Sequence, residues 1–238
     1  MGGGMSMTHE RGPFFGLLIA QLFFIGVSPF VSDSGAGRTF LFAAIFAIMG
    51  ASAYVSASSR NLLIVSIAVL LSAGMAWLGP DVMPGNSDEF LRLGIVGFGT
   101  AFTAVTVLVT VARHHRVTTD TILGGINAYL LIAVAFTFFH AIVIVVETDA
   151  YTLGGVPIRD ILDSHEDTRG YATLLYFSFT TLTTLGYGDM VPVHPVARLL
   201  ASGEAVLGQL FVAIFIARLV SLEVSQRGSP SGEDANDR

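Results

Sequence analysis

Nine consecutive residues in the C-terminal third of the chain have the types and the spacing to bind an ion. They read Thr181-Leu182-Thr183-Thr184-Leu185-Gly186-Tyr187-Gly188-Asp189. In a Thr-x-Gly-Tyr-Gly loop, the backbone carbonyls and a Thr hydroxyl can replace the water around a dehydrated K⁺ ion. Glycine at 186 and 188 suits such a strand because its dihedral angles alternate between right- and left-handed values, which residues with a Cβ resist. The run therefore predicts K⁺ binding at Thr184, Leu185, Gly186 and Tyr187.

The composition of the whole chain indicates a membrane protein. Hydrophobic residues make up 53% and charged residues 13% of the sequence, and the mean hydropathy is +0.70, far from the balance of a soluble domain. The net charge of −6 gives no reason to expect a nucleic-acid partner. The chain has no Cys, which excludes disulfides and thiol chemistry.

Apolar segments on both sides of the nine-residue run are expected to position it in a bilayer. Six stretches are long enough to cross, since about 20 residues suffice. They are Phe14–Val31, Phe40–Ala57, Leu62–Leu78, Leu91–Ala112, Ile122–Val146 and Val196–Leu222. A seventh piece, Tyr171–Thr183, is too short to span and fits a re-entrant helix buried in protein. The predicted fold is an all-α membrane protein with six transmembrane helices, a re-entrant pore helix and a selectivity-filter loop.

Arginine residues predict the orientation of these segments. Arg60 and the cluster Arg113–Arg116 follow the second and fourth predicted spans, whereas most acidic residues lie in the opposite loops. The positive-inside rule places the Arg-containing turns in the cytoplasm. An even number of spans then leaves both termini cytoplasmic and the filter loop facing outward, in a multi-pass protein of the cell membrane.

From Thr121 to Gln226 the sequence resembles the tetrameric potassium-channel superfamily, and Tyr176–Val224 is similar to the pore of small prokaryotic potassium channels. The family's filter positions are occupied by Thr184, Leu185, Gly186, Tyr187 and Gly188. Leu185 stands where Val or Ile is commonest. The resemblance implies a homotetramer, because a K⁺ site needs carbonyl rings from four filter loops and each chain supplies one. It implies permeant K⁺ and no cofactor.

The same resemblance assigns residues that support the filter. Asp189 matches an acidic residue that hydrogen-bonds an aromatic side chain on the pore helix, and Tyr176 occupies that aromatic position. Thr180 stands where some members have a buried Glu or Val that influences filter collapse, so inactivation behaviour does not transfer. Thr183 is assigned to filter support with these three residues.

The last predicted span supplies the hinge and the cavity of the family. Gly208 stands at the position of the hinge glycine. Gln209, Val212, Ile216 and Val220 fall on roughly one helix face, which by resemblance lines the cavity below the filter. Contact of this face with lipid or with another helix is the alternative interpretation.

For three charged or titratable residues in or near the predicted spans, the sequence allows two interpretations of the role of each side chain. Glu204 either hydrogen-bonds behind the filter or pore helix, or reaches water or Arg198. His140 is either a packing residue with satisfied hydrogen bonds or a proton sensor. Arg218 either extends to the membrane interface or binds lipid or latches a gate.

The expected function is passive, K⁺-selective conduction without strong intrinsic voltage gating, because the fourth span carries Arg92 and Arg113 only at its edges. A weakly selective cation channel and a pore-like membrane sensor are the alternatives. No enzyme is expected, since neither Gly-x-Ser-Gly nor His-Glu-x-x-His occurs. The expected divisions are a four-span block at 1–118, a pore domain at 119–225 and a disordered cytoplasmic tail at 226–238.

Overall fold

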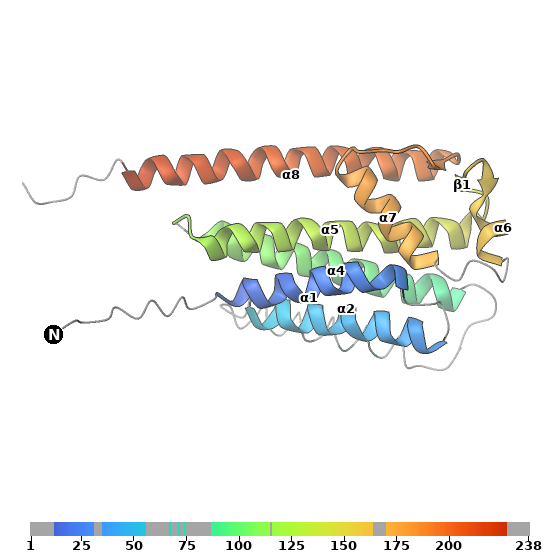
Figure 1. Cartoon of the computed structure of the whole chain (residues 1–238), viewed down its shortest axis with the longest axis horizontal. Coiled ribbons are helices and arrows are strands. Elements are labelled where there is room, and N and C mark those ends of the chain that lie inside the picture. The colour runs from blue at the N-terminus through green and yellow to red at the C-terminus, as the bar shows by residue number, and fades with distance from the viewer. Residues whose placement is uncertain are drawn as a thin grey trace, which may run out of the picture.

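The computed structural model describes residues 12–30, 35–55, 67, 71, 74, 87–114, 116–163 and 170–227. Nearly all of the described chain is helical, and its long helices lie side by side in a bundle (Figure 1). In chain order the helices are α1 (Pro13–Val27), η1 (Ser28–Phe30), α2 (Gly35–Val55), α4 (Ser87–Arg113), α5 (Thr119–Val146), α6 (Ile158–Asp163), α7 (Gly170–Leu182) and α8 (Pro195–Arg227).

Three helices within the described residues are long and apolar enough to cross a membrane. They cover Asp88–Arg113, Thr119–Val146 and Pro195–Ser225, which correspond to α4, α5 and α8. The first two predicted spans coincide with α1 and α2, whose apolar parts are shorter. The third, Leu62–Leu78, lies mostly outside the described residues, as does the predicted tail. The structure therefore supports a helical membrane protein, while the count of six spans stays a prediction.

Local signals in the sequence explain where α5 begins and how α4 tolerates its polar residues. The Thr118 hydroxyl accepts a hydrogen bond from the Thr121 backbone N–H at 3.1 Å, which caps the first turn of α5. In α4, each of four Thr hydroxyls donates to the carbonyl four residues earlier, so these four hydroxyls are paired within the helix itself. These residues are Thr100, Thr103, Thr106 and Thr110.

The N-terminal helix α1 is tied to α5 by two polar side chains. Asp120 Oδ1 accepts a hydrogen bond from the Phe14 backbone N–H at 3.2 Å, which satisfies a free donor at the positive end of α1. Asn127, which is fully buried, donates from Nδ2 to the Phe14 carbonyl at 2.9 Å. A helix of the predicted N-terminal block thus packs directly on the predicted outer helix of the pore.

A small antiparallel sheet closes one end of the bundle, at the right of Figure 1. Its central strand β1 (Tyr151–Leu153) pairs with β2 (Val156–Pro157) on one side and with β3 (Met190–Pro192) on the other. Gly154 and Gly155, with φ of 59° and 84°, form the tight turn between β1 and β2. Because β3 follows directly on Asp189, the sheet fixes the chain where it leaves the predicted filter.

Candidate ion-conduction site

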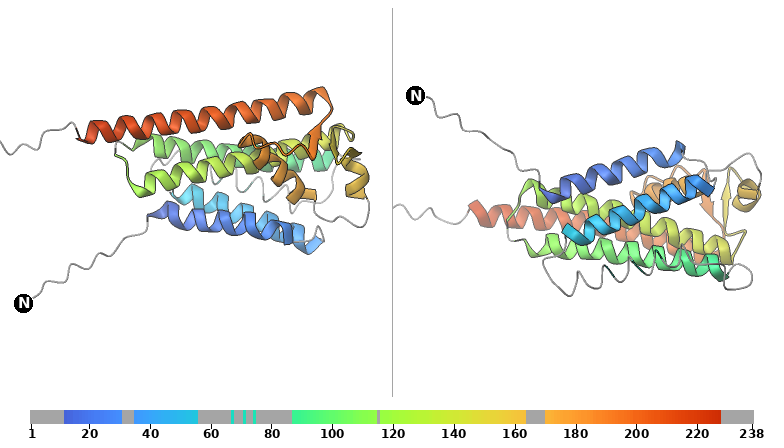
Figure 2. Two further views of the ribbon diagram at one scale, coloured as in Figure 1. Left: turned by 45° about the horizontal axis from the view of Figure 1, so that its top comes forward. Right: turned by 90° about the horizontal axis from the view of Figure 1, so that it is seen from below.

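Helix α7 is placed as a re-entrant pore helix would be. Its 13 residues are too few to span a bilayer. It lies inclined to the long helices and packs against both α5 and α8, and the chain then turns back along α8 to β3 (Figures 1 and 2). The residues from Thr183 to Asp189 form the loop between α7 and the sheet.

The backbone of this loop has the alternation that the sequence predicted. Thr184, Gly186 and Gly188 have φ of 58°, 52° and 79°, whereas Leu185 and Tyr187 between them are not among the positive-φ residues. This alternation of left- and right-handed residues is the backbone conformation that glycine at 186 and 188 makes accessible. Thr184 is the one residue with a side chain among the described positive-φ positions, and such backbone conformations concentrate at functional sites.

Hydrogen bonds from α7 and α8 hold the beginning of the loop. The Gly186 N–H donates to the Thr180 carbonyl at 3.1 Å, and the Thr183 hydroxyl donates to the Phe179 carbonyl at 2.6 Å. The Thr184 hydroxyl donates to the Thr183 carbonyl at 2.7 Å and accepts from Gln209 Nε2 at 3.1 Å. A predicted cavity residue therefore touches the innermost predicted filter residue. Their roles in conduction stay predictions.

The end of the loop is held by the contact that the resemblance implied. The Tyr176 hydroxyl donates to Asp189 Oδ2 at 2.7 Å, and Asp189 Oδ1 accepts from the Met190 N–H at 2.9 Å. The bond from Tyr176, more than any other contact, lowers the pKa of Asp189 below its usual 3.8. The interaction with ionised Asp189 is therefore fully present above pH 3.8 and is lost as the pH falls through the lowered pKa.

Gly208 has a packing role that the sequence did not indicate. A Cβ at this position would lie 2.0 Å from the backbone carbonyl oxygen of Leu182, the last residue of α7. The same carbonyl accepts a hydrogen bond from the Tyr129 hydroxyl of α5 at 3.3 Å. Glycine is required here because the inner helix and the end of the pore helix approach closely. The hinge role stays a prediction, since α8 is one continuous helix in this structure.

The other predicted cavity residues lie on an exposed face of the single chain. Val212, Ile216 and Val220 are 41%, 55% and 58% exposed. Only 6% of the most apolar stretch of α8 is buried, against 50% for α4 and for α5. The long apolar helix that follows the predicted filter is thus largely uncovered by the rest of the described chain.

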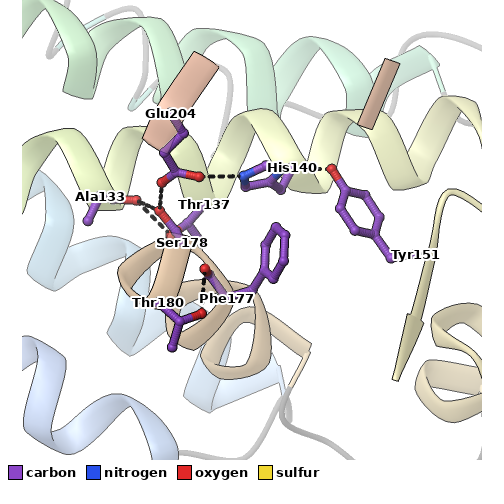
Figure 3. A network of polar contacts seen from close by, with 8 residues as sticks. All are labelled: Ala133, Thr137, His140, Tyr151, Phe177, Ser178, Thr180 and Glu204. Carbon is purple, nitrogen blue, oxygen red and sulfur yellow. Dashed lines mark hydrogen bonds and ion pairs between the residues drawn. The ribbon is translucent and has the colours of Figure 1, made fainter. Parts of the chain in front are cut away.

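Glu204 lies in a fully buried polar network behind α7 (Figure 3). Its Oε1 lies 2.5 Å from the Ser178 hydroxyl oxygen, and its Oε2 lies 2.8 Å from His140 Nε2. His140 Nδ1 in turn lies 2.6 Å from the Tyr151 hydroxyl. Of the two interpretations of Glu204, the contact behind the pore helix is confirmed, while Arg198 instead donates from Nε to the Pro192 carbonyl at 3.2 Å.

The Tyr151 hydroxyl is protonated in this network. Burial, followed by the charge of Glu204, raises the pKa of Tyr151 above its usual 10.0, so the hydroxyl keeps its hydrogen. Nδ1 of His140 is paired with this hydroxyl, and Nε2 is paired with Glu204 Oε2. His140 is therefore a residue with both ring nitrogens satisfied. Sequence reasoning missed Ser178 and Tyr151, for which no motif gave a signal.

Arg218 connects α8 to the end of α4. Its Nη2 donates to the Ala112 carbonyl and, at 3.2 Å, to the His114 carbonyl. Carbonyls at a helix C-terminus have no partner within the helix, and a cation there is favoured by the helix dipole. The contact places the predicted inner helix against the predicted N-terminal block.

Comparisons with known proteins identify relatives of this chain. The family described as Ion channel matches residues 126–224. Protein LctB of Bacillus caldotenax is 30% identical over 135 residues, which cover 56% of this chain and 95% of LctB. Calcium-gated potassium channel TvoK of Thermoplasma volcanium is 35% identical over 95 residues, 38% of this chain and 26% of TvoK. Two-pore potassium channel 1 of Arabidopsis thaliana is 36% identical over 70 residues, 29% of this chain and 19% of that protein.

These matches and the structure define the class of protein. The family match and the relatives point to an ion channel, and the described chain supplies a short helix, a loop of alternating handedness and a long apolar helix within the matched residues. The chain belongs to the potassium-channel superfamily. It spans only about a fifth to a quarter of the length of the Arabidopsis channel and of TvoK. No solved structure gives a significant match.

Proposed function

We propose that the protein conducts K⁺ selectively and passively across the cell membrane. The observation that carries this proposal is the alternation of φ at Thr184, Gly186 and Gly188. On this proposal the loop's carbonyls turn toward the pore. Oxygen atoms so arranged replace the hydration shell of K⁺ without a charged ligand. The names of TvoK and the Arabidopsis channel support the same ion. On this proposal the filter faces outward and both termini are cytoplasmic.

The pore forms at the axis of a homotetramer. One filter motif occurs in the sequence, whereas each K⁺ site requires a ring of carbonyls. The small buried share of α8 supports this assembly, because an apolar helix face uncovered by its own chain is available to neighbouring subunits. Gln209, Val212, Ile216 and Val220 then line the cavity, and residues 119–225 form the pore domain.

Ion flux into liposomes tests the function and separates it from its alternatives. Purified protein is reconstituted, and uptake is measured with K⁺ or with Na⁺ as the only permeant cation. We expect K⁺ uptake down its gradient, at least roughly a hundredfold faster than Na⁺ uptake. Equal uptake of the two ions would replace the proposal by a weakly selective cation channel. Absence of both fluxes from a correctly assembled protein would favour a membrane sensor.

The conductance is expected to depend only weakly on voltage. Moving one charge through 100 mV is worth about 2.3 kcal/mol, so steep gating requires several mobile charges per subunit. In α4 the basic residues are Arg92 near its beginning and Arg113 at its end. Planar-bilayer recording should give a shallow conductance–voltage relation in the wild type and in Arg92→Gln and Arg113→Gln. A steep relation that either substitution abolishes would contradict this expectation.

The intracellular end of the cavity is expected to close as an apolar constriction. Val220 and Ile216 lie on the same exposed face of α8, and four copies of such side chains can exclude water. Val220→Asn should therefore raise the resting K⁺ leak severalfold by wetting the constriction, whereas Val220→Leu, which stays apolar, should not. Liposome K⁺ efflux measures both. An unchanged leak in the Asn variant would mean that the gate lies elsewhere, for example at the filter.

A further inference from the structure

We infer that Glu204 and His140 act as one buried positioning unit that holds the two flanks of the filter. This inference deepens the proposed function and rests on it. Both side chains are 0% exposed, and they join α8 to α5 at 2.8 Å behind the pore helix. Each has a second partner: Ser178 lies on α7, the helix that precedes the loop, and Tyr151 lies on β1, which pairs with β3, the strand that follows the loop (Figure 3).

The first arm of this unit holds the pore helix. The Ser178 oxygen lies 2.5 Å from Glu204 Oε1 and 2.7 Å from the Ala133 carbonyl of α5. One hydroxyl group therefore joins α7 to both long helices of the pore module. Thr180, by contrast, donates its hydroxyl to the Phe177 carbonyl within α7. Position 180 is where some members of the superfamily have a buried Glu. In this chain the buried carboxylate behind α7 is that of Glu204, which lies on α8.

The second arm reaches the outer end of the filter. The Tyr151 hydroxyl lies 2.6 Å from His140 Nδ1, and Tyr151 pairs with Pro192 in the β1–β3 ladder. The Gly154 N–H of the adjacent turn donates to the Asp189 carbonyl at 2.8 Å. Phe177 packs edge-on against both His140 and Tyr151, with ring centroids 4.9 Å and 5.5 Å apart. The helix before the filter and the strand after it are therefore both held, directly or through β1, by the Glu204–His140 pair.

A buried polar network of this kind sets position more than it adds stability. Burying a charged or polar pair gains little net free energy over an apolar pair of the same volume, but its hydrogen bonds are directional. The filter carbonyls repel one another when K⁺ leaves, so the loop needs restraints from behind to keep its shape. Loss of the unit should therefore show most clearly when external K⁺ is low.

The test compares two replacements of Glu204. Gln at 204 can accept from His140 Nε2–H through its carbonyl and donate to Ser178 through its amide, so Ser178 keeps its hydrogen for Ala133. Leu at 204 can do neither. Tetramers in liposomes are held at decreasing external K⁺, and the concentration that preserves half of the K⁺ flux is measured, together with the ratio of K⁺ to Na⁺ flux. Glu147→Leu removes an exposed carboxylate and serves as the matched control.

We expect Glu204→Leu to need at least roughly tenfold more external K⁺ than the wild type, and Glu204→Gln to stay within about twofold of it. Ser178→Ala and Tyr151→Phe, which each remove one oxygen, test the two arms even if the Leu variant does not assemble, and each should shift the concentration in the same direction. Wild-type values in Glu204→Leu, or in both single-oxygen variants, would overturn the inference. Absence of K⁺-selective flux in the wild type would instead overturn the proposed function.

Discussion

Gly186→Ala is expected to abolish K⁺-selective flux in a tetramer that still assembles. Gly186 has φ of 52°, and a Cβ added there would meet nothing within 4 Å, so the substitution acts through the backbone alone. Left-handed conformation costs a residue with a Cβ about 1–2 kcal/mol. Relief of that strain rotates the neighbouring peptide planes, and the tetramer contains four copies of the change. The carbonyl oxygens then leave the positions in which they replace water around K⁺.

Gly155→Ala provides a control with the same kind of strain away from the filter. Gly155 has φ of 84° in the turn between β1 and β2, and it too has open space around it. Both variants should assemble, as size-exclusion chromatography in detergent would report, but only Gly186→Ala should lose liposome K⁺ uptake. Selective uptake in the Gly186 variant would remove the central assignment, and equal loss in both variants would trace the effect to general strain.

The backbone conformation of the loop 184–188 could be predicted from the sequence because its requirements are local. Its geometry depends on which residues accept positive φ. The glycines at 186 and 188 mark two such positions in the sequence, and both have positive φ in the structure. The helices α4, α5 and α8 were predictable for a similar reason, since length and apolar composition alone define a membrane span. Position 184 is the exception within the loop: a Thr at φ of 58° is not predictable from local preference.

The buried network was beyond sequence reasoning because its members are far apart in the chain. His140 is 64 positions from Glu204, and Ser178 is 26 positions from it. A carboxylate in an apolar segment indicates that a partner must exist, but the sequence does not identify that partner. The interpretations of Glu204 therefore stayed open until the packing of α5, α7 and α8 was known. Arg218 is a similar case, because its partners are backbone carbonyls at the end of α4, which no side-chain motif marks.

Gly208 shows how one residue type can have two physical explanations. The resemblance explains this glycine by helix bending, whereas the structure adds a close approach to the Leu182 carbonyl. Both explanations predict that a larger residue impairs the channel. They differ in which property fails: a hinge controls how often the pore opens, while the contact at Leu182 controls the shape of the filter that begins at the next residues.

Gly208→Ala is therefore expected to alter selectivity and unit conductance, and not only open probability. The new Cβ would lie 2.0 Å from a backbone oxygen, so α8 or the end of α7 must move. Overpacking of this kind costs about 1–3 kcal/mol in each chain. The displaced segment leads directly into Thr183 and Thr184, and the ratio of K⁺ to Na⁺ flux should fall at least roughly tenfold.

Gly203→Ala, on the same helix, is the matched control for this prediction. A Cβ at 203 meets nothing within 4 Å, and Ala in place of Gly favours a helix by up to about 1 kcal/mol. That variant should keep wild-type flux and selectivity. Single-channel recording then separates the two explanations of Gly208, because a pure hinge would leave Gly208→Ala with wild-type conductance and selectivity during rarer openings. Such a record would show that the contact with Leu182 is relaxed without effect on the filter, and that bending of α8 is what the glycine provides.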